Sequence, residues 1–246
     1  MFENLFSMQQ KTCVITGGYR GLGAFMAQGF LEAGAKRVYI TGRKAQACIT
    51  AAEELSKFGE CIALPGDAST SEGLSQLVRE INEREDHIDV LVNNAGTAWG
   101  APFGEFPVKG WDKVMDINVK SPFFLTQALT PLLSKNASAQ HTSTVINIGS
   151  IAGILGNGLD TFSYAVSKSA IHQVTRVLAT ELAASHIRVN AIAPGRFYSK
   201  MTDFLSSDQA AFDEELQTIP MKRWGEPSDI AGVAIMLASQ AGAFIT

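Results

Sequence analysis

Short apolar runs alternate with longer amphipathic stretches along most of this chain of 246 residues. The apolar runs have the length of buried β-strands, and they lie at residues 11–16, 37–41, 60–65, 88–92 and 144–148. The stretches between them have helical spacing, as in residues 24–33, where Gly34 marks the end of the helix. Strands that alternate with helices pair in parallel through helical crossovers. The alternation from Thr12 to Val189 therefore predicts an α/β protein with one doubly wound, Rossmann-like parallel sheet.

Composition narrows the class of protein. With 46% apolar residues the chain can bury one sizeable core, so we expect residues 1–246 to form a single domain. A net charge of −4 makes nucleic acid an unfavourable partner. The three cysteines and four histidines lack the spacing of metal ligands, and the start of the chain lacks the features of a secretory signal. The spacing of these cysteines and histidines predicts a protein without a metal. No apolar run is long enough to span a membrane, and the cysteine usage fits a reducing compartment, so we expect a cytoplasmic protein.

The first predicted strand is followed directly by a glycine-rich turn, Gly17-Gly18-Tyr19-Arg20-Gly21-Leu22-Gly23. A nucleotide turn needs glycine because the chain bends sharply and its backbone approaches the phosphates, which the following helix amino terminus attracts. Gly17, Gly21 and Gly23 stand at the required positions. Such a triplet alone also fits an ordinary tight turn. The strand before it and the helix after it favour a site for a pyrophosphate.

The second strand predicts which dinucleotide binds. Chains that prefer NAD usually place a carboxylate after this strand to bind the ribose 2′-hydroxyl. Here the sequence is Gly42-Arg43-Lys44, and Arg20 lies in the glycine turn. Basic groups can pair with a 2′-phosphate, so the pattern predicts NADP(H). The alternative is that Arg43 and Lys44 form only a solvated start to the next helix.

Polar residues also end the third and fourth predicted strands. Asp67-Ala68 follows the third, where the aspartate could accept a hydrogen bond from the adenine amino group, and Asn93-Asn94-Ala95-Gly96 follows the fourth. In a doubly wound sheet these positions adjoin the cofactor. Both segments also suit ordinary turns, because Asn, Asp and Gly favour turns wherever they occur.

Four polar residues further along have an order and spacing that indicate catalysis. Lys168 follows Tyr164 by one helical turn, so its ammonium can lie near the phenol and favour the phenolate. We expect Tyr164 to carry a proton and Lys168 to lower its pKa. Ser150 ends an apolar run, where its hydroxyl could orient a substrate carbonyl. Asn118 lies within a long helical pattern, and its amide could hold a water that relays protons to Lys168.

A Tyr-x-x-x-Lys match alone is more often one face of an amphipathic helix than a site. Four matches in chain order behind a nucleotide turn favour the site.

Together these residues resemble the short-chain dehydrogenase/reductase family, in its branch with one Rossmann-like domain. The similarity runs from Thr12 to Thr246. Its motifs are Thr16-Gly17-x3-Gly21-x-Gly23, Asp67, Asn93-Asn94-Ala95-Gly96, Asn118, Ser150, Tyr164-x3-Lys168 and Pro194-Gly195. The resemblance implies that Lys168 also binds the nicotinamide ribose, and that Pro194-Gly195 with Ser199 hold the carboxamide. The expected cofactor-binding residues are Gly17, Tyr19, Arg20, Gly21, Leu22, Gly23, Arg43, Asp67, Ala68, Asn94, Ala95, Gly96, Tyr164, Lys168, Pro194, Gly195 and Ser199.

Residues 94–100, 193–197 and 219–225 are similar to a bacterial 3-oxoacyl reductase branch linked to rhamnolipid synthesis. The family resemblance implies a homodimer or homotetramer built from the helices with Asn118 and Tyr164. Carrier-protein-dependent reductases often have a basic residue where this chain has Ser185-His186, which argues against docking of an acyl carrier protein. Family members usually continue past the position of Thr246 with a last strand, which we expect to be missing from this chain.

The resulting hypothesis is NADPH-dependent reduction of a carbonyl in fatty acid metabolism, with a 3-oxoacyl thioester as substrate and Tyr164 as general acid. We expect a specificity loop over residues 195–220. Its apolar pocket would be lined by Phe197, Tyr198, Met201, Phe204 and Leu205, together with Trp99 and Ile151. Alternatively, Phe204, Leu205 and Phe212 only pack a short helix onto the body. Basic groups such as Arg196 could face an anionic substrate or simply be solvated.

Two other functions stay open. The same catalytic residues would serve a reductase or dehydrogenase of another ketone or alcohol, such as a sugar, a steroid or a quinone. A non-catalytic NADP(H) sensor could also use this fold.

Overall fold

The computed structural model describes residues 4–155, 160–197 and 209–246. Six strands form one sheet in the order β3-β2-β1-β4-β5-β6, and every neighbouring pair is parallel. The strands are β1 (Thr12–Ile15), β2 (Arg37–Gly42), β3 (Cys61–Pro65), β4 (Val90–Asn93), β5 (Ser143–Ile148) and β6 (Ile187–Ile192). Strands β2 and β3 extend the sheet on one side of β1, and β4 to β6 extend it on the other side, so the order confirms the doubly wound sheet.

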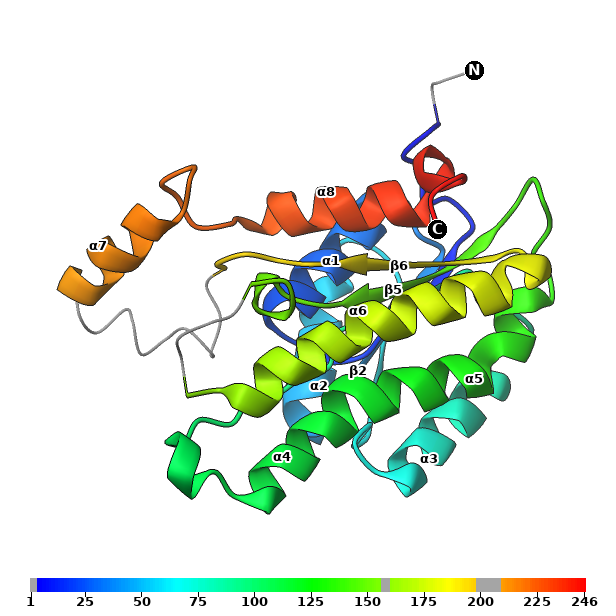
Figure 1. Cartoon of the computed structure of the whole chain (residues 1–246). Coiled ribbons are helices and arrows are strands. Elements are labelled where there is room, and N and C mark those ends of the chain that lie inside the picture. The colour runs from blue at the N-terminus through cyan, green and yellow to red at the C-terminus, as the bar shows by residue number, and fades with distance from the viewer. Residues whose placement is uncertain (1–3, 156–159, 198–208) are drawn as a thin grey trace.

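Helices cover both faces of the sheet (Figure 1). One face carries α1 (Gly21–Glu32), α2 (Ala45–Leu55) and α8 (Pro227–Ala238). The other carries α3 (Ser71–Asn82), α5 (Ser121–Ser134) and α6 (Phe162–Leu182), with α4 (Val108–Met115) beside α6. Helix α7 (Gln209–Thr218) lies apart at one end of the molecule in Figure 1. Short 3₁₀ turns lie at Phe103–Glu105, Ile151–Gly153, Ala183–Ser185 and Gln240–Gly242.

The two cores explain why the strands read as continuous apolar runs. In β1, Cys13 and Ile15 face the core under α1 and α8, whereas Val14 between them faces the core under α5 and α6. Side chains alternate across a strand, so a sheet covered on both faces needs apolar residues at every position. The three cysteines are buried and free, and burial raises their pKa values.

Two local features differ from the sequence prediction. Helix α1 begins at Gly21, three residues before the predicted start at 24, because two of the turn's glycines already belong to its first turn. The predicted long helix around Asn118 is interrupted by a π-helical turn, Asp116–Lys120, between α4 and α5. Such turns insert an extra residue into a helix and are frequent at functional sites.

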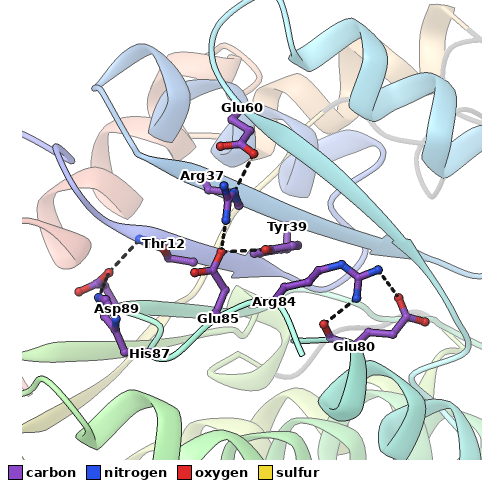
Figure 2. A network of polar contacts seen from close by, with 9 residues as sticks. All are labelled: Thr12, Arg37, Tyr39, Glu60, Glu80, Arg84, Glu85, His87 and Asp89. Carbon is purple, nitrogen blue, oxygen red and sulfur yellow. Dashed lines mark hydrogen bonds and ion pairs between the residues drawn. The ribbon is translucent and has the colours of Figure 1, made fainter. Parts of the chain in front are cut away.

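A polar network lies at the amino-terminal end of the strands (Figure 2). Glu85, which is 8% exposed, accepts hydrogen bonds from Arg37 Nη1 at 2.5 Å and from Tyr39 Oη at 2.8 Å. Arg37 Nε also pairs with Glu60 Oε1 at 2.9 Å. Burial raises the pKa of Tyr39 to about 12, and Glu85 adds to the shift. These contacts tie β2 to the segments that lead into β3 and β4.

The described sheet ends at β6. Its outer edge is contacted by Thr246, whose Oγ1 accepts a hydrogen bond from Val189 N at 3.0 Å. Among the described residues, no helix combines the length and the apolar character needed to cross a bilayer.

Candidate active site

Ser150, Tyr164 and Lys168 meet at the carboxyl end of β5. Ser150 follows this strand directly and is buried, and its hydroxyl is hydrogen-bonded to the phenol of Tyr164 on α6. Lys168, one turn later on α6, donates a hydrogen bond to Ile148 O at 2.7 Å. Its Nζ lies 5.6 Å from the centre of the Tyr164 ring. The helical spacing therefore places Tyr164 and Lys168 on the same side of α6, and the end of β5 brings Ser150 to them.

Asn118 joins this group through the π-helical turn. Its Oδ1 accepts a hydrogen bond from Thr97 N at 2.9 Å, and its Nδ2 donates to Thr97 O and to Ser167 Oγ, both at 2.9 Å. Both amide hydrogens are thus used within the protein. A Cβ built on Gly96 would lie 3.3 Å from Asn118 Oδ1 and 3.7 Å from Lys168 Nζ, so both atoms lie beside Gly96. The second lone pair of Oδ1 is the part of the amide that stays available to a water.

The pKa of Tyr164 differs from the expectation. Burial raises it, because desolvation disfavours the phenolate. The hydrogen bond from Ser150 and the positive charge of Arg196 oppose the rise, whereas Lys168 is not among the groups that lower it. The expected lowering by Lys168 was therefore wrong as the leading effect: its ammonium faces Ile148 O. Tyr164 is a neutral phenol, which is the form that can donate a proton.

Burial also governs Lys168. It is 5% exposed, and desolvation lowers the pKa of its ammonium from 10.5 to about 8. The charge on Lys168 is therefore sensitive to pH just above neutrality.

The glycine turn is braced by the end of β4. Gly17 and Gly21 have φ values of 65° and 52°, which favour glycine. Asn94 Nδ2 donates to Thr16 O at 2.9 Å and to Gly17 O at 3.2 Å. A Cβ on Gly23 would lie only 2.5 Å from this Nδ2, so glycine is required for the close approach. The Asn94 side chain thus shapes the turn, which is the turn chemistry that the sequence left open.

The turn leaves room for a ligand. A Cβ built on Gly21, or on Gly195 after β6, would meet no atom within 4 Å. No side chain caps the start of α1, so backbone N–H groups of its first turn are not used by a capping residue. An uncapped helix start beside an open glycine backbone fits a pyrophosphate. The side chain of Leu22 packs against the core, so Leu22 offers this site mainly its backbone. Ala68, after β3, is buried.

Basic side chains surround the end of β2. The Arg20 guanidinium lies 5.2 Å from the centre of the Tyr19 ring, and this ring covers Gly42, where a Cβ would come within 2.4 Å of it. Arg43 is exposed and its Nη1 lies 4.0 Å from Asp67 Oδ2. Asp67 Oδ1 accepts bonds from Ser69 N and Oγ. Arg20 lies in the glycine turn and Arg43 follows β2, and one carboxylate oxygen of Asp67 is already engaged.

Comparisons with known proteins agree with this geometry. Residues 17–246 match the family described as Enoyl-(Acyl carrier protein) reductase, named adh_short_C2. The chain is 48% identical over 241 residues to the rhamnolipids biosynthesis 3-oxoacyl-[acyl-carrier-protein] reductase of Pseudomonas aeruginosa, covering 98% of this chain and 94% of that protein. The chain belongs to the short-chain dehydrogenase/reductase family. It is therefore an oxidoreductase.

Two further comparisons show which proteins this short-chain dehydrogenase/reductase is similar to. The 2-dehydro-3-deoxy-D-gluconate 5-dehydrogenase of Dickeya dadantii is 38% identical over 246 residues, covering 100% of this chain and 94% of that protein. Among solved structures, the Pseudomonas aeruginosa RhlG/NADP active-site complex has a TM-score of 0.96 at 48% identity, covering 99% of this chain and 95% of that one. Relatives thus include proteins named for acyl substrates and for sugar acids.

The segment after β6, where the sequence predicts the specificity loop, lies beside Ser150. Pro194 O accepts a hydrogen bond from Ile151 N at 3.2 Å, which places the segment beside Ser150. Arg196 follows and forms an ion pair with Glu215 of α7. Phe197 packs against the core and against Gly225. The expected residues Tyr198, Ser199, Met201, Phe204 and Leu205 lie outside the described residues.

Two other expected pocket residues are described. The Trp99 ring packs on Gly110 of α4, where a Cβ would lie 2.7 Å from it, and Lys113 Nζ lies 5.5 Å from its centre. Ile151, by contrast, is 38% exposed beside Ser150. Phe212 of α7 stacks on the buried Trp224 with ring centres 5.5 Å apart, so this phenylalanine does pack the helix onto the body.

Sequence reasoning missed a buried network beneath the site. Asn93 Nδ2 donates to Asn147 Oδ1 at 2.9 Å and to Thr126 Oγ1 at 3.1 Å, and Asn147 Nδ2 donates to Thr175 Oγ1 at 2.9 Å. It joins β4 and β5 to α5 and α6. The signal was an asparagine inside each apolar strand.

His172 was also missed. A Cβ on Gly149 would lie 2.0 Å from His172 Nε2, so the glycine before Ser150 is required by this packing. Burial lowers the pKa of His172, and Lys168 and Arg176 add to the effect. A neutral imidazole therefore supports the backbone at Ser150. In the described parts of the chain, no three His, Cys, Asp or Glu side chains come together as metal ligands.

Proposed function

We propose that this oxidoreductase uses NADPH to reduce the ketone of a 3-oxoacyl thioester to a 3-hydroxyacyl thioester. The observation that carries the proposal is the contact of Ser150, Tyr164 and Lys168 beside an open glycine turn. The similarity to the rhamnolipid 3-oxoacyl reductase supports the substrate class, and the likeness to the RhlG/NADP complex supports the cofactor.

The residues of the chain would divide the work. When bound, NADPH supplies a hydride to the carbonyl carbon. Tyr164, a neutral phenol, would donate its proton to the carbonyl oxygen, while the hydroxyl of Ser150 donates a hydrogen bond to the same oxygen as charge develops there. Lys168 would bind the nicotinamide ribose and take part in the relay that returns a proton to Tyr164. Asn118 holds the backbone of Thr97 beside the ammonium and would help to position a water for reprotonation.

The cofactor-binding residues stay proposals of the same kind. Backbone groups of the glycine turn would bind the pyrophosphate, and Arg20 and Arg43 would pair with the 2′-phosphate. Asp67 and Ala68 would contact the adenine, and Asn94, Ala95 and Gly96 would contact the ribose side. Pro194 and Gly195 would hold the carboxamide.

Apolar side chains near Ser150 suit an acyl chain. Ile151, Ile154 and Leu155 follow this serine and are 38%, 67% and 64% exposed. Clustered, exposed aliphatic side chains beside a catalytic group indicate an apolar ligand. The competing function is reduction of a sugar-acid ketone, favoured by the similarity to 2-dehydro-3-deoxy-D-gluconate 5-dehydrogenase.

We further propose a homodimer or homotetramer formed through the α5 and α6 surfaces. Phe124 on α5 and Val166 and Val177 on α6 are 45%, 44% and 54% exposed, which is costly for apolar side chains left in water. Ser185 and His186 stand where carrier-protein-dependent reductases often have a basic residue, so coenzyme A is the simpler thioester carrier.

A substrate comparison tests the proposal. The rate of NADPH consumption would be measured with 3-oxoacyl-CoA of four, eight and twelve carbons, as chosen probes, and with a 5-keto sugar acid, each repeated with NADH. The expected result is a higher kcat/KM for the thioesters with NADPH. A clear preference for the sugar acid would favour the competing function, and tight NADPH binding with no turnover of any ketone would favour a sensor.

A further inference from the structure

Arg196 belongs to the segment that borders the proposed active site. Arg196 leaves the sheet two residues after Pro194, whose carbonyl is bonded to Ile151 N next to Ser150. The side chain is about one-third exposed. Its charge acts on the Tyr164 phenol and lowers the pKa of that group against the effect of burial. A substrate ketone that contacts Tyr164 and Ser150 therefore lies within the influence of this charge.

That positive charge is already paired within the protein. Arg196 Nε and Glu215 Oε1 form an ion pair, and Glu215 is the more buried partner, with 20% of its side chain exposed. One further contact holds α7 itself, and two hold the segment that follows it against Arg196 and Phe197. Phe212 stacks on Trp224, Gly225 N donates to Arg196 O at 2.8 Å, and the Phe197 ring covers Gly225. The carboxylate of Glu215 is thus held by its ion pair with Arg196, and its helix is held by the stacking of Phe212 on Trp224.

We propose that the ion pair of Arg196 with Glu215 selects neutral ketones and excludes those that carry a carboxylate close to the reacting carbonyl. This rests on the proposed function and adds a specificity-determining pair to it. A carboxylate that approached Arg196 would have to displace Glu215 or lie beside it, and two like charges in a partly buried site repel. An ester or thioester group brings no charge next to the ketone and leaves the ion pair intact.

This kind of selection works by penalising the wrong substrate. An unpaired arginine beside the catalytic phenol would attract an oxo acid, and the same arginine with a fixed carboxylate partner does not. The substrates named for the sugar-acid relatives react at carbon 5, four carbons from their carboxylate, so the ion pair is expected to act most strongly on oxo acids whose carboxylate lies nearer the ketone.

The test compares methyl 3-oxohexanoate with 3-oxohexanoate, two ketones that differ in charge at one end. Two quantities would be measured for each ketone with each protein variant. They are kcat/KM with NADPH and the affinity of the ketone for the protein–NADPH complex, followed by cofactor fluorescence. The wild-type chain should prefer the ester in both. In Glu215→Gln, the ratio of acid to ester in kcat/KM and in affinity should rise at least about fivefold, since an arginine freed from its partner attracts an anion.

Three variants make the result specific. Glu214→Gln removes the same charge from the exposed neighbouring position on α7 and should keep the wild-type ratio. Glu215→Asp retains the carboxylate and should also stay close to that ratio. Adding Arg196→Gln to Glu215→Gln should abolish the gain for the acid.

An unchanged ratio of acid to ester in Glu215→Gln, with normal NADPH affinity, would overturn the inference. So would equal binding of acid and ester by the wild-type chain. Failure of the proposed function is distinct: the wild-type chain would then turn over neither the ester nor a 3-oxoacyl-CoA, while the binding measurements would still test the ion pair.

Discussion

Lys168 Nζ donates a 2.7 Å hydrogen bond to the backbone carbonyl of Ile148, the last residue of β5. This bond fixes the ammonium of α6 at the end of the strand that presents Ser150. It also explains why burial, and not Lys168, dominates the pKa of Tyr164: the ammonium is directed at a carbonyl and lies 5.6 Å from the ring centre.

The pH dependence of reduction should follow Lys168. Its pKa is lowered to about 8, so the ammonium is lost as the pH rises through about 8, while the raised pKa of Tyr164 keeps the phenol protonated. We expect kcat for reduction to fall above about pH 8, and the Lys168→Met variant to lose this limb together with at least about 90% of the rate, as for removal of a positioned charge. Steady-state rates from pH 6 to 10 would show it. A flat profile through pH 9 in the wild-type chain would contradict the assignment.

The same shift affects stability. Between about pH 8 and 10.5 the unfolded chain keeps a proton on Lys168 that the folded chain has lost. The contribution of this group to the free energy of unfolding therefore increases with pH across that window, and its unfavourable effect is fully present below pH 8. Urea unfolding of the wild-type chain and of Lys168→Met at pH 7 and 10 would isolate this contribution. The free energy of unfolding of the wild-type chain minus that of the variant should increase from pH 7 to pH 10. A decrease in this difference would contradict the assigned pKa of Lys168.

Arg43 should determine much of the preference for NADPH. It is exposed directly after β2, where a 2′-phosphate would gain a charge-assisted hydrogen bond of about 1.5–3 kcal/mol. Arg43→Ser should weaken NADPH binding by roughly tenfold or more and leave NADH binding nearly unchanged. Lys57→Ser, at an exposed position after α2, is the charge-matched control. Equal losses for both cofactors would argue against 2′-phosphate recognition.

Asn147 should contribute to stability more than to binding. It is fully buried, and its removal would leave Asn93 Nδ2 and Thr175 Oγ1 with fewer partners. We expect Asn147→Ala to lower the free energy of unfolding by about 1–3 kcal/mol. Urea unfolding would measure it, with Asn136→Ala at an exposed position as control. A change below about 0.5 kcal/mol, which is typical of surface sites, would show that the network is dispensable.

Glu85 offers a contrast at the other end of the sheet. In Glu85→Gln, Arg37 Nη1 and Tyr39 Oη would lose their shared carboxylate (Figure 2). The loss should be about 1–3 kcal/mol, below the value for a fully buried pair, because Arg37 keeps 23% side-chain exposure. Thermal unfolding would follow it, with the exposed Glu83→Gln as control. Catalysis should be unaffected at room temperature, and a selective loss of kcat in Glu85→Gln would contradict the separation of this network from the site.

The sequence predicts much of this molecule and misses what depends on distant packing. The strands and the residues from Ser150 to Lys168 follow local rules: apolar runs of strand length and a four-residue helical spacing. The π-helical turn at Asn118 and the network of Asn93 with Asn147 depend on contacts between elements. The pair of Arg196 with Glu215 spans 19 positions across a segment without a periodic signal. The direction in which the pKa of Tyr164 shifts depends on the burial of its phenol. The spacing of Tyr164 and Lys168 in the sequence does not reveal this burial.

The most direct test of the central claim is single-site removal of the Tyr164 hydroxyl. Tyr164→Phe and the wild-type chain would be compared for NADPH affinity by fluorescence and for NADPH consumption with a 3-oxoacyl-CoA. We predict unchanged affinity within about threefold and a loss of kcat of at least about 100-fold, the lower end of the range for a general acid. Substantial turnover by Tyr164→Phe with intact cofactor binding would contradict the role of Tyr164 as the proton donor.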